Sequence, residues 1–572
     1  MASDDVIQTG KFLLTKVDKE TVENLVEELM VKKNYLLPAF QREFVWDEED
    51  IKDFIDSIIK GFPVGAVILW KPSRAVVEND SLAKPILGNR KDLEEQEVYY
   101  VLDGQQRLTA LLLMFNNWKI KRDGEEISRI PISIRVSGEG YKLYKSEKIG
   151  VNLCEALKAF STGSVYDPKA MEKLREKLDE RAYRLLGDIA RKRIAGYEIP
   201  IYILETSDED ETVFSEMAEA FTRVNRAGIR IGNVELILSY LAGKVSGSLK
   251  EGIISIYRGL ENFKIDLQPV IRTVLSEFGI KQTDIKAERF NSVIRTLQNF
   301  SEDKIKISLK NVSKSIGLVA DFLRKELGVK DTRILPSQIP LVTLAKYFTT
   351  IGINDITEVD KASKEKIEKW FILVSFNGYY SSYPDTKLEL DLKTVQRNGE
   401  FPFEDLVENI KERGGKIEIT REDLKKGMKE NVVRGKVGKA YLFLLYILLV
   451  KNGADNWANL KIAETPFDDL AKHHIFPKDY LKRELVVEEE ENMDISINNL
   501  ANITFVDKRI NSEIGDKAPK EYLPNYSLSL NKHFIPRDEN LWTIETYEAF
   551  LEGRISLIWS KAKELYPSIF VG

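Results

Sequence analysis

The pattern of hydrophobic and polar positions changes once along the chain. Up to about residue 115, short apolar runs alternate with amphipathic stretches, which predicts strands alternating with helices. Four acidic residues at 47–50 suit the first turn of a helix, because the positive end of the helix dipole favours carboxylates, and Gly61 suits its C-terminal cap. We expect this helix at residues 47–61, another from residue 108 to 115, and strands at 64–70, 98–102, 131–136 and 199–204.

From about residue 211 the pattern becomes helical and stays so. Apolar residues recur at helical spacing in residues 214–224 and 234–241, and long amphipathic stretches continue to residue 454. Residues 440–450 are the most apolar run, but they are too few to span a bilayer, so we expect a buried helix there. The segment 452–455 is typical of a joint before a last, shorter module.

Composition narrows the class of protein. With 572 residues, 43% hydrophobic and 10% aromatic, the chain is long and apolar enough for several folded domains. Its one cysteine, Cys154, excludes a disulfide framework and a cysteine-based zinc site. The first ten residues carry no signal-peptide pattern, so we expect a cytoplasmic protein. Because 85 Lys and Arg against 91 Asp and Glu give a net charge of −6, any DNA contact must come from a local basic patch.

Two of the three histidines, His473 and His474, are adjacent in the segment Lys-His-His-Ile-Phe-Pro. Neutral imidazole is both a general base near neutral pH and a metal ligand. Downstream, residues 503–506 predict a strand, and Asp507 can cap a following helix that carries Asn511. Two strands and a helix would aim one histidine at a metal held by the other histidine and the asparagine. A partly exposed loop is the other interpretation of a His-His pair.

The histidine segment, the spaced asparagines and a Lys-rich stretch through Lys517 resemble the HNH (His-Me finger) nucleases, in the subtype at the C-terminus of GmrSD-type modification-dependent restriction enzymes. The resemblance covers about residues 467–523. It implies that His474 is the general base that activates water, and that Asn502 orients this histidine through its side-chain amide. Asn499 is a competing choice for the orienting residue.

The same resemblance implies that His473 and Asn511 ligate one divalent cation, Mg²⁺ or Mn²⁺. His473 replaces the carboxylate common in the family, and a neutral nitrogen ligand favours Mn²⁺, Ni²⁺ or Zn²⁺ more than Mg²⁺. Three nearby cations are candidates for contact with DNA phosphates, although a solvated surface is the alternative for each: Lys508, Arg509 and Lys517.

Near the N-terminus, the motif Asp103-Gly104-Gln105-Gln106-Arg107 lies between a predicted strand and a predicted helix. Free backbone N–H groups at a helix start, beside a glycine that permits close approach, make an anion site. Arg107 can bind a phosphate with both arms of its guanidinium, and Asp103 can bind a cation or accept a proton. A plain turn with an N-terminal cap is the other interpretation.

Three further motifs accompany this one in order: Leu-Pro-Ala-Phe-Gln-Arg at 37–42, Gly-Phe-Pro-Val-Gly at 61–65, and Phe-Thr-Arg-Val-Asn-Arg-Ala-Gly at 221–228. Together they resemble the N-terminal domain of the same GmrSD-type family, a relative of the ParB and sulfiredoxin nucleotide-binding fold. The resemblance implies binding and hydrolysis of GTP or ATP, coupled to sensing of modified DNA, with Asp103 as a catalytic residue. No Walker-type loop is present, which excludes a P-loop mechanism.

The implied nucleotide site consists of the motif residues Asp103, Gly104, Gln105, Gln106 and Arg107, lined by Gln41, Arg42, Arg223 and Asn225. Three of the four lining residues have a structural alternative: Gln41 and Arg42 cap the following element, and Arg223 pairs with Glu219 four residues earlier. For Phe40, Phe44, Trp46 and Trp70 we expect core positions rather than base stacking.

A basic segment at residues 421–439 is the other candidate for nucleic-acid contact, and Arg434 and Lys436 are its candidate binding residues. Its seven positive residues outnumber three negative ones, which suits phosphate contact. A solvated helix face explains the same pattern equally well, so both interpretations stay open.

We therefore predict a helix-rich α+β protein in three parts: a ParB/sulfiredoxin-like α/β nucleotide-binding sensor at residues 1–240, a helical connecting region at 241–454 that offers a homodimer surface, and a C-terminal ββα-metal (HNH) nuclease module at 455–572. The expected function is anti-phage defence by a type IV-like restriction endonuclease. It would couple NTP hydrolysis and DNA-modification sensing to metal-dependent cleavage or nicking of double-stranded phage DNA. The alternative is a nucleotide-regulated DNA-binding or partner-binding protein with a degenerate HNH module.

Overall fold

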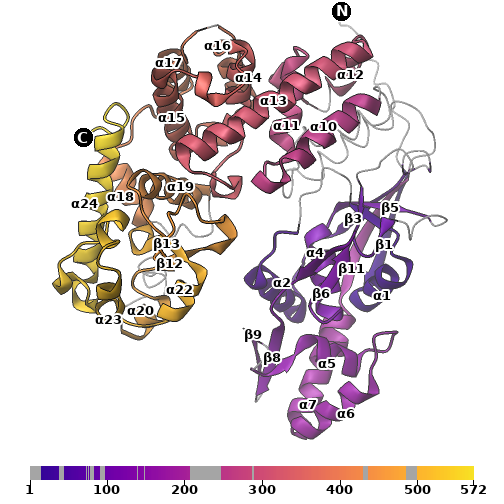
Figure 1. Ribbon diagram of the computed structural model, residues 1–572. Coiled ribbons are helices and arrows are strands. Elements are labelled where there is room, and N and C mark those ends of the chain that lie inside the picture. The colour runs from indigo at the N-terminus through magenta and orange to yellow at the C-terminus, as the bar shows by residue number, and fades with distance from the viewer. Residues whose placement is uncertain are drawn as a thin grey trace, which may run out of the picture. The chain divides into compact units, whose positions relative to one another are not determined.

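The chain divides into two compact units in a computed structural model (Figure 1). The first unit comprises Met1–Ser246 and Lys286–Gln298, and the second comprises Gly247–Ile285 and Asn299–Gly572. The structure describes residues 14–37, 44–72, 74, 77, 83–90, 97–137, 140–146, 149–205, 247–286, 289–397, 399–429, 436–484 and 499–572. The predicted three-part division, with boundaries at residues 240 and 454, stays a prediction.

The first unit is built on a mixed six-stranded sheet of order β1-β11-β3-β5-β2-β4. β11 pairs in parallel with β3, and β5 with β2, whereas the other neighbours are antiparallel. Its strands are β1 (Leu14–Thr21), β2 (Tyr35–Leu37), β3 (Val67–Lys71), β4 (Lys84–Pro85), β5 (Tyr99–Asp103) and β11 (Glu198–Glu205). The helices α1 (Val22–Lys32), α2 (Glu48–Lys60) and α4 (Gln105–Phe115) share one hydrophobic core with it.

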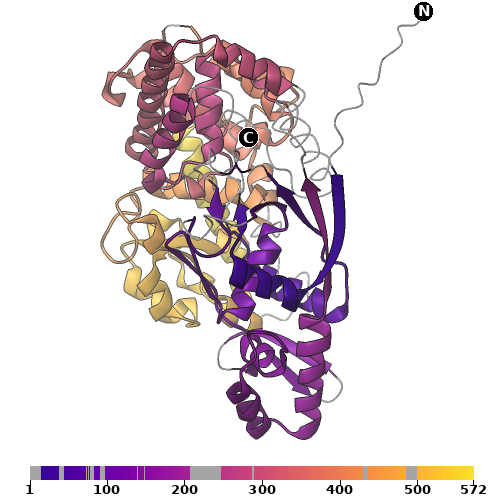
Figure 2. The same cartoon turned by 90° about the vertical axis from the view of Figure 1, so that its right-hand side faces the viewer.

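The first unit also contains elements outside this six-stranded sheet. They are a hairpin of β6 (Lys119–Arg122) and β7 (Glu125–Ser128), a small sheet of β8 (Ile132–Ser137), β9 (Gly140–Lys145) and β10 (Val151–Asn152), and the helices α5 (Leu153–Phe160), α6 (Pro168–Lys177), α7 (Glu180–Asp188), η2 (Ile189–Ala195) and α12 (Phe290–Gln298). The helices α5, α6 and α7 gather at one end of this unit in both views (Figures 1 and 2).

The second unit begins with a helical core. Its helices are α10 (Gly247–Gly259), η3 (Glu261–Phe263), α11 (Leu267–Glu277), η4 (Gln282–Asp284), α13 (Glu302–Leu327), η6 (Thr332–Ile334), α14 (Pro340–Ile351), η7 (Ile356–Glu358), α15 (Lys361–Phe376), η8 (Tyr379–Ser381), α16 (Pro384–Thr394), α17 (Phe403–Glu412), α18 (Arg421–Lys429) and α19 (Lys436–Lys451). α19 is buried along residues 440–449, as its apolar sequence predicts.

The chain after α19 completes the second unit with one strand pair among short helices. These elements are η9 (Phe467–Asp469), β12 (Leu470–His474), α20 (Lys478–Glu484), η10 (Leu500–Asn502), β13 (Ile503–Asp507), α22 (Lys508–Ile514), α23 (Pro519–Tyr522), η11 (Leu523–Tyr526), η12 (Leu530–His533), η13 (Glu539–Leu541), η14 (Ile544–Thr546) and the long α24 (Tyr547–Leu565). α24 contacts both α18 and α19.

Local signals explain the helix α2. The carboxylate of Asp47 accepts hydrogen bonds from the N–H groups of Glu49 and Asp50, and Asp50 accepts one from the N–H of Asp47, which closes a capping box. Gly61 ends the helix in the left-handed region, at φ 74°. The predicted helix is therefore confirmed at both ends.

The helix α4 begins earlier than predicted. Gly104 adopts φ 100°, so the chain leaves β5 and enters the helix at Gln105 within a single residue. Gln105, Gln106 and Arg107 therefore form the first helical turn rather than a loop before it. Every residue of α4 except Arg107 is buried.

The other predicted elements compare as follows. The strands expected at 98–102, 131–136, 199–204 and 503–506 are confirmed within one residue, whereas the strand expected from residue 64 starts at Val67. Phe44 and Trp70 are core residues, and Trp46 is half-buried against Phe54, as expected. The helices expected at 214–224 and 234–241, and Phe40, lie outside the described residues. Within the described ranges, no helix combines the length and apolar character needed to cross a membrane.

Candidate active site

A pair of antiparallel strands and the helix after them bring the C-terminal candidate residues together. In the register of β12 and β13, His473 lies opposite Thr504, and His474 lies opposite Ile503. Asp507 ends β13 and caps α22, because its carboxylate accepts a hydrogen bond from the N–H of Arg509 at 2.8 Å. This cap starts α22 directly after the strand, so that its Asn511 reaches back to β12.

His473 is held by two polar side chains in a buried position. Its Nδ1 atom lies 2.8 Å from Oδ1 of Asn511, and its Nε2 atom lies 3.0 Å from the hydroxyl oxygen of Tyr522. The Tyr522 hydroxyl in turn donates to the carbonyl oxygen of Ile475 at 2.6 Å. Only 2% of His473 is exposed, and burial lowers its pKa to about 4, so the imidazole is neutral near pH 7.

The hydrogen-bond pattern determines which nitrogen of His473 carries the proton. Tyr522 has a single hydroxyl hydrogen, and that hydrogen is donated to Ile475. The tyrosine oxygen can therefore only accept from His473, which puts the imidazole proton on Nε2 and leaves a lone pair on Nδ1. This lone pair faces the amide oxygen of Asn511, another acceptor.

Two acceptors 2.8 Å apart repel unless a positive centre lies between them or the Asn511 amide rotates to donate. A nitrogen lone pair and an amide oxygen that converge in this way fit a divalent cation as two ligands. A histidine that binds a metal through one ring nitrogen usually donates a hydrogen bond from the other. The Nε2–H of His473 makes such a bond to the hydroxyl oxygen of Tyr522.

Asn502 lies next to this pair but contacts the main chain rather than the ring of His474. Its fully buried amide accepts from the N–H of Phe476 at 2.8 Å and donates to the carbonyl of Phe476 at 2.9 Å. Its own carbonyl accepts from the N–H of Ile475 at 2.8 Å. The sequence predicts that the amide of Asn502 orients the ring of His474 directly. In the structure, Asn502 instead holds the main chain of the turn that follows the histidine. Asn499 instead caps η10 through the N–H of Ala501.

The N-terminal motif forms a second cluster, at the junction of β5 and α4. Asp103 is the last residue of β5, and its carboxylate pairs with Nη2 of Arg107 at 2.8 Å. Nη1 of Arg107 donates to the carbonyl of Val64 at 3.0 Å. Gly104 allows close packing on β3, because a Cβ atom there would lie 3.1 Å from a methyl carbon of Val67.

The two glutamines of this motif have different surroundings. The amide oxygen of Gln106 accepts from the N–H groups of Val45 and Trp46, which ties the start of α4 to the segment before α2. The amide oxygen of Gln105 is buried, and none of the residues that the structure describes donates a hydrogen bond to it. The four residues predicted to line this site lie outside the described residues: Gln41, Arg42, Arg223 and Asn225.

Comparison with known families matches both clusters. The model of the GmrSD restriction endonuclease N-terminal domain matches residues 25–242, and that of the GmrSD C-terminal domain matches residues 420–550. The chain belongs to the GmrSD restriction endonuclease family. It is also similar to an uncharacterized protein of Methanocaldococcus jannaschii, with 23% identity over 94% of this chain and 98% of the other. The family identifies a restriction-type nuclease with DNA as its substrate.

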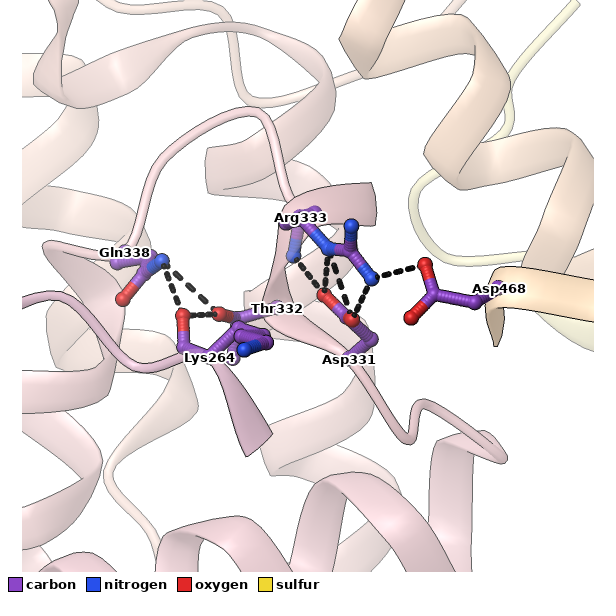
Figure 3. A network of polar contacts seen from close by, with 6 residues as sticks. All are labelled: Lys264, Asp331, Thr332, Arg333, Gln338 and Asp468. Carbon is purple, nitrogen blue, oxygen red and sulfur yellow. Dashed lines mark hydrogen bonds and ion pairs between the residues drawn. The ribbon is translucent and has the colours of Figure 1, made fainter. Parts of the chain in front are cut away.

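The GmrSD C-terminal domain is anchored to the helical core just before β12 (Figure 3). Arg333 of η6 binds the carboxylate of Asp331, and its Nη2 atom also contacts Asp468 at 2.6 Å. Next to it, Gln338 donates to the hydroxyl of Thr332 at 2.9 Å and to the carbonyl of Lys264 at 3.3 Å. The strand that ends in the two histidines therefore begins two residues after a contact with the helical core.

Three residues of this GmrSD site were missed by sequence reasoning: Trp457, Tyr522 and Arg554. The ring of Trp457 lies 5.3 Å from that of His473 and stacks on Tyr526 at 4.5 Å, centroid to centroid. Its backbone adopts φ 64°, a left-handed conformation that bulky residues rarely take. None of the three stands at a spacing that a local pattern would reveal, because the fold alone brings them to the histidines.

The basic candidates of the GmrSD chain lie in different environments. Lys508, Arg509 and Lys517 are exposed, although Arg509 also contacts Asp507. In the basic segment, Lys425 pairs with Glu552 of α24 at 2.6 Å, and Arg421 donates to Ser556 at 2.7 Å. This part of the segment therefore packs on α24. Arg434 and the side chain of Lys436 lie outside the described residues.

Proposed function

We propose that the second unit is a metal-dependent DNA endonuclease of the HNH type. The observation that carries this proposal is the contact between Nδ1 of His473 and Oδ1 of Asn511, which lie 2.8 Å apart. The proposed base, His474, is the residue directly after His473. When bound there, a divalent cation stabilises the charge that develops on the phosphate and on the leaving oxygen.

In this proposal His474 acts as the general base. It takes a proton from a water molecule, the hydroxide oxygen forms a bond to phosphorus, and the bond from phosphorus to the leaving oxygen breaks. The leaving oxygen then takes a proton from solvent. The half-buried His474 ends β12, where the turn clamped by Asn502 limits its movement. That restraint suits a base that must meet a water molecule in one geometry.

The donor set also predicts a metal preference. An imidazole nitrogen and an amide oxygen are both neutral, so we expect Mn²⁺ to support cleavage better than Mg²⁺. Replacement of His473 by Asp restores a carboxylate at this position. We therefore expect H473D to regain activity with Mg²⁺ relative to Mn²⁺.

Nicking and cleavage of supercoiled plasmid by the purified full chain tests this function. We expect activity with Mn²⁺ or Mg²⁺, loss of activity in EDTA, and loss in His474→Ala and Asn511→Ala at unchanged melting temperature. A His474→Ala protein that cuts DNA at the wild-type rate would show that the proposed base is wrong. The alternative is a DNA-binding or partner-binding protein with a degenerate nuclease module. It would be favoured if wild type showed no metal-dependent nicking of plasmid or of modified phage genomes, with GTP, ATP or neither.

The first unit is proposed to bind and hydrolyse a nucleotide at Asp103–Arg107. Two observations support this: no side chain caps the N-terminus of α4, and within the described residues no group donates to the buried amide oxygen of Gln105. Free N–H groups at a helix start suit a phosphate, and an amide oxygen suits a hydroxyl or amino group of a nucleoside.

Cleavage of differently modified phage genomes, with GTP, ATP or neither, tests the coupling between the two activities. We expect Asp103→Ala to abolish NTP hydrolysis, and its effect on DNA cleavage measures how strongly the units are coupled. Equal cleavage of all genomes with and without nucleotide would contradict modification sensing. The homodimer and the cytoplasmic location stay predictions.

A further inference from the structure

Arg554 of α24 is a buried cation whose hydrogen bonds all go to the main chain. Its Nη1 atom donates to the carbonyls of Ala501 at 2.6 Å and Ile503 at 2.7 Å. Its Nε and Nη2 atoms donate to the carbonyl of His533 at 3.4 and 3.2 Å. Arg554 has 0% exposure, and within the described ranges no carboxylate pairs with it.

Stability alone does not explain such a residue. Burial of a charged group without a counter-charge is expensive, and a well-packed apolar side chain of similar volume often serves a core as well or better. Burial also lowers the pKa of Arg554 to about 9. Its contacts therefore need a reason beyond filling space.

The two carbonyls that Nη1 binds flank Asn502, at the point where the 3-10 helix η10 passes into β13. The carbonyl of Asn502 itself accepts from the N–H of Ile475. Arg554 and the residue after His474 therefore bind the carbonyls of three consecutive residues at this junction.

Two sets of contacts thereby fix Asn502. Arg554 holds the carbonyls on either side of it, and the Asn502 amide and carbonyl hold Ile475 and Phe476. These two residues directly follow His474 in the chain. A shift of Asn502 along or away from the strand would therefore move the turn that carries the proposed base.

A second route from Arg554 reaches the same strand. The carbonyl of His533 accepts from the guanidinium, while the ring of His533 contacts the hydroxyl of Thr504 at 2.7 Å and the carbonyl of Asp455 at 2.7 Å. His533 is fully buried. Arg554 therefore contacts Ile503 of β13 directly and reaches the next residue, Thr504, through His533.

We propose that Arg554 is a positioning residue for His474 that acts through Asn502. This inference rests on the proposed nuclease function. It assigns to α24, outside the strand pair and its helix, a role in the chemical step rather than in DNA binding or metal binding.

The test compares steady-state cleavage by Arg554→Met and by Arg272→Met in the full chain. Arg272 is a matched control, since it is also buried in the second unit, at 4% exposure, but binds Gln282 and Asp385. We expect R554M to lower kcat by about 10- to 100-fold, the size expected for a displaced catalytic group. KM for DNA and the metal concentration for half-maximal rate should stay within about threefold of wild type, and R272M should keep kcat even where its melting temperature falls.

A double-mutant cycle distinguishes positioning from general destabilisation. If Arg554 acts through Asn502, R554M combined with Asn502→Ala lowers kcat no further than Asn502→Ala alone, because neighbouring residues in one network are not additive. Independent, multiplying effects on kcat would overturn the route through Asn502.

Arg554→Lys covers the case in which R554M does not fold. Lysine keeps the charge but lacks the planar guanidinium, so we expect an intermediate kcat. A wild-type kcat in a folded R554M, or in R554K where R554M is unfolded, overturns the inference while an inactive His474→Ala still supports the nuclease. An active His474→Ala protein instead removes the proposed function itself.

Discussion

The guanidinium of Arg107 lies directly over the backbone of Gly65. A Cβ atom added to Gly65 would stand 2.3 Å from Nη1 of Arg107, and Gly65 itself adopts φ 86°. The same guanidinium binds the carbonyl of Val64 and the carboxylate of Asp103. The motifs at residues 61–65 and 103–107 are therefore in direct contact in the N-terminal domain. A side chain larger than glycine at residue 65 would collide with the guanidinium of Arg107.

Gly65→Ala is expected to displace Arg107 and to weaken nucleotide binding. Its matched control is Gly124→Ala, because Gly124 has nearly the same φ, 88°, but nothing within 4 Å of an added Cβ. In both variants, alanine in a left-handed conformation should lower the free energy of unfolding by about 1–2 kcal/mol. Only G65A should also lose nucleotide affinity in calorimetric titrations. Equal affinity in the two variants would show that Arg107 does not depend on this glycine.

Arg333 forms ion pairs with Asp331 and Asp468. We expect the two ion pairs to contribute unequally to the free energy of unfolding. Asp331 has a side chain that is 7% exposed, whereas that of Arg333 is 47% exposed, and the backbone N–H of residue 333 still donates to Asp331 in the variant; Arg333→Ala should therefore destabilise the second unit by about 1–2 kcal/mol. Asp468 is 74% exposed, so Asp468→Asn should change stability by less than about 1 kcal/mol. Chemical denaturation followed by far-UV circular dichroism measures both. A loss from D468N as large as that from R333A would contradict this assignment.

Local signals explain why parts of the fold were predictable. The capping box at Asp47 and the cap at Asp507 each involve residues within a few positions of one another, so the pattern contains them. The contact between His473 and Asn511 follows from a short strand pair and the helix directly after it. The helix α4 was placed too late because the pattern marks the first apolar residue, whereas Gly104 lets the helix begin with polar residues.

Long-range packing explains what sequence reasoning missed. Tyr522, Trp457 and Arg554 reach the histidine strand from three separate segments. In the sequence, an arginine on an amphipathic helix predicts a solvated surface position, and nothing nearby indicates that Arg554 is fully buried. Only the packing of α24 against η10 gives it that role.

If His473 and Asn511 bind a metal as proposed, Tyr522→Phe should weaken that binding. The variant removes the oxygen that accepts from Nε2 of His473, so the imidazole loses the group that fixes its proton on that nitrogen. Loss of such an outer hydrogen bond lowers metal affinity about 10- to 100-fold in other proteins. Titration calorimetry with Mn²⁺ measures the change. Tyr526→Phe is the control, since it keeps the ring that stacks on Trp457, and the prediction is wrong if both variants bind Mn²⁺ equally.

Asp391 predicts a pH-dependent stability of the second unit. Its carboxylate is fully buried and accepts hydrogen bonds from the hydroxyl of Tyr380 at 2.5 Å and from the amide of Asn409 at 2.9 Å. Burial raises its pKa from 3.8 to about 7, although nearby Lys387 opposes the shift. Because the pKa is higher in the folded state, the folded protein binds the proton more tightly than the unfolded chain, and stability falls as pH rises through this interval.

Asp391→Asn removes this dependence. Between the two pKa values, the unfolding free energy of wild type should fall relative to that of the variant by about 1.4 kcal/mol for each pH unit. Melting temperatures of both proteins from about pH 5 to about pH 8 measure the difference, which cancels the other titrating groups. We expect wild type to lose its relative stability as pH rises to about 7 and to change little above it. A difference that stays constant over the whole range would mean that Asp391 is ionised in the folded protein throughout.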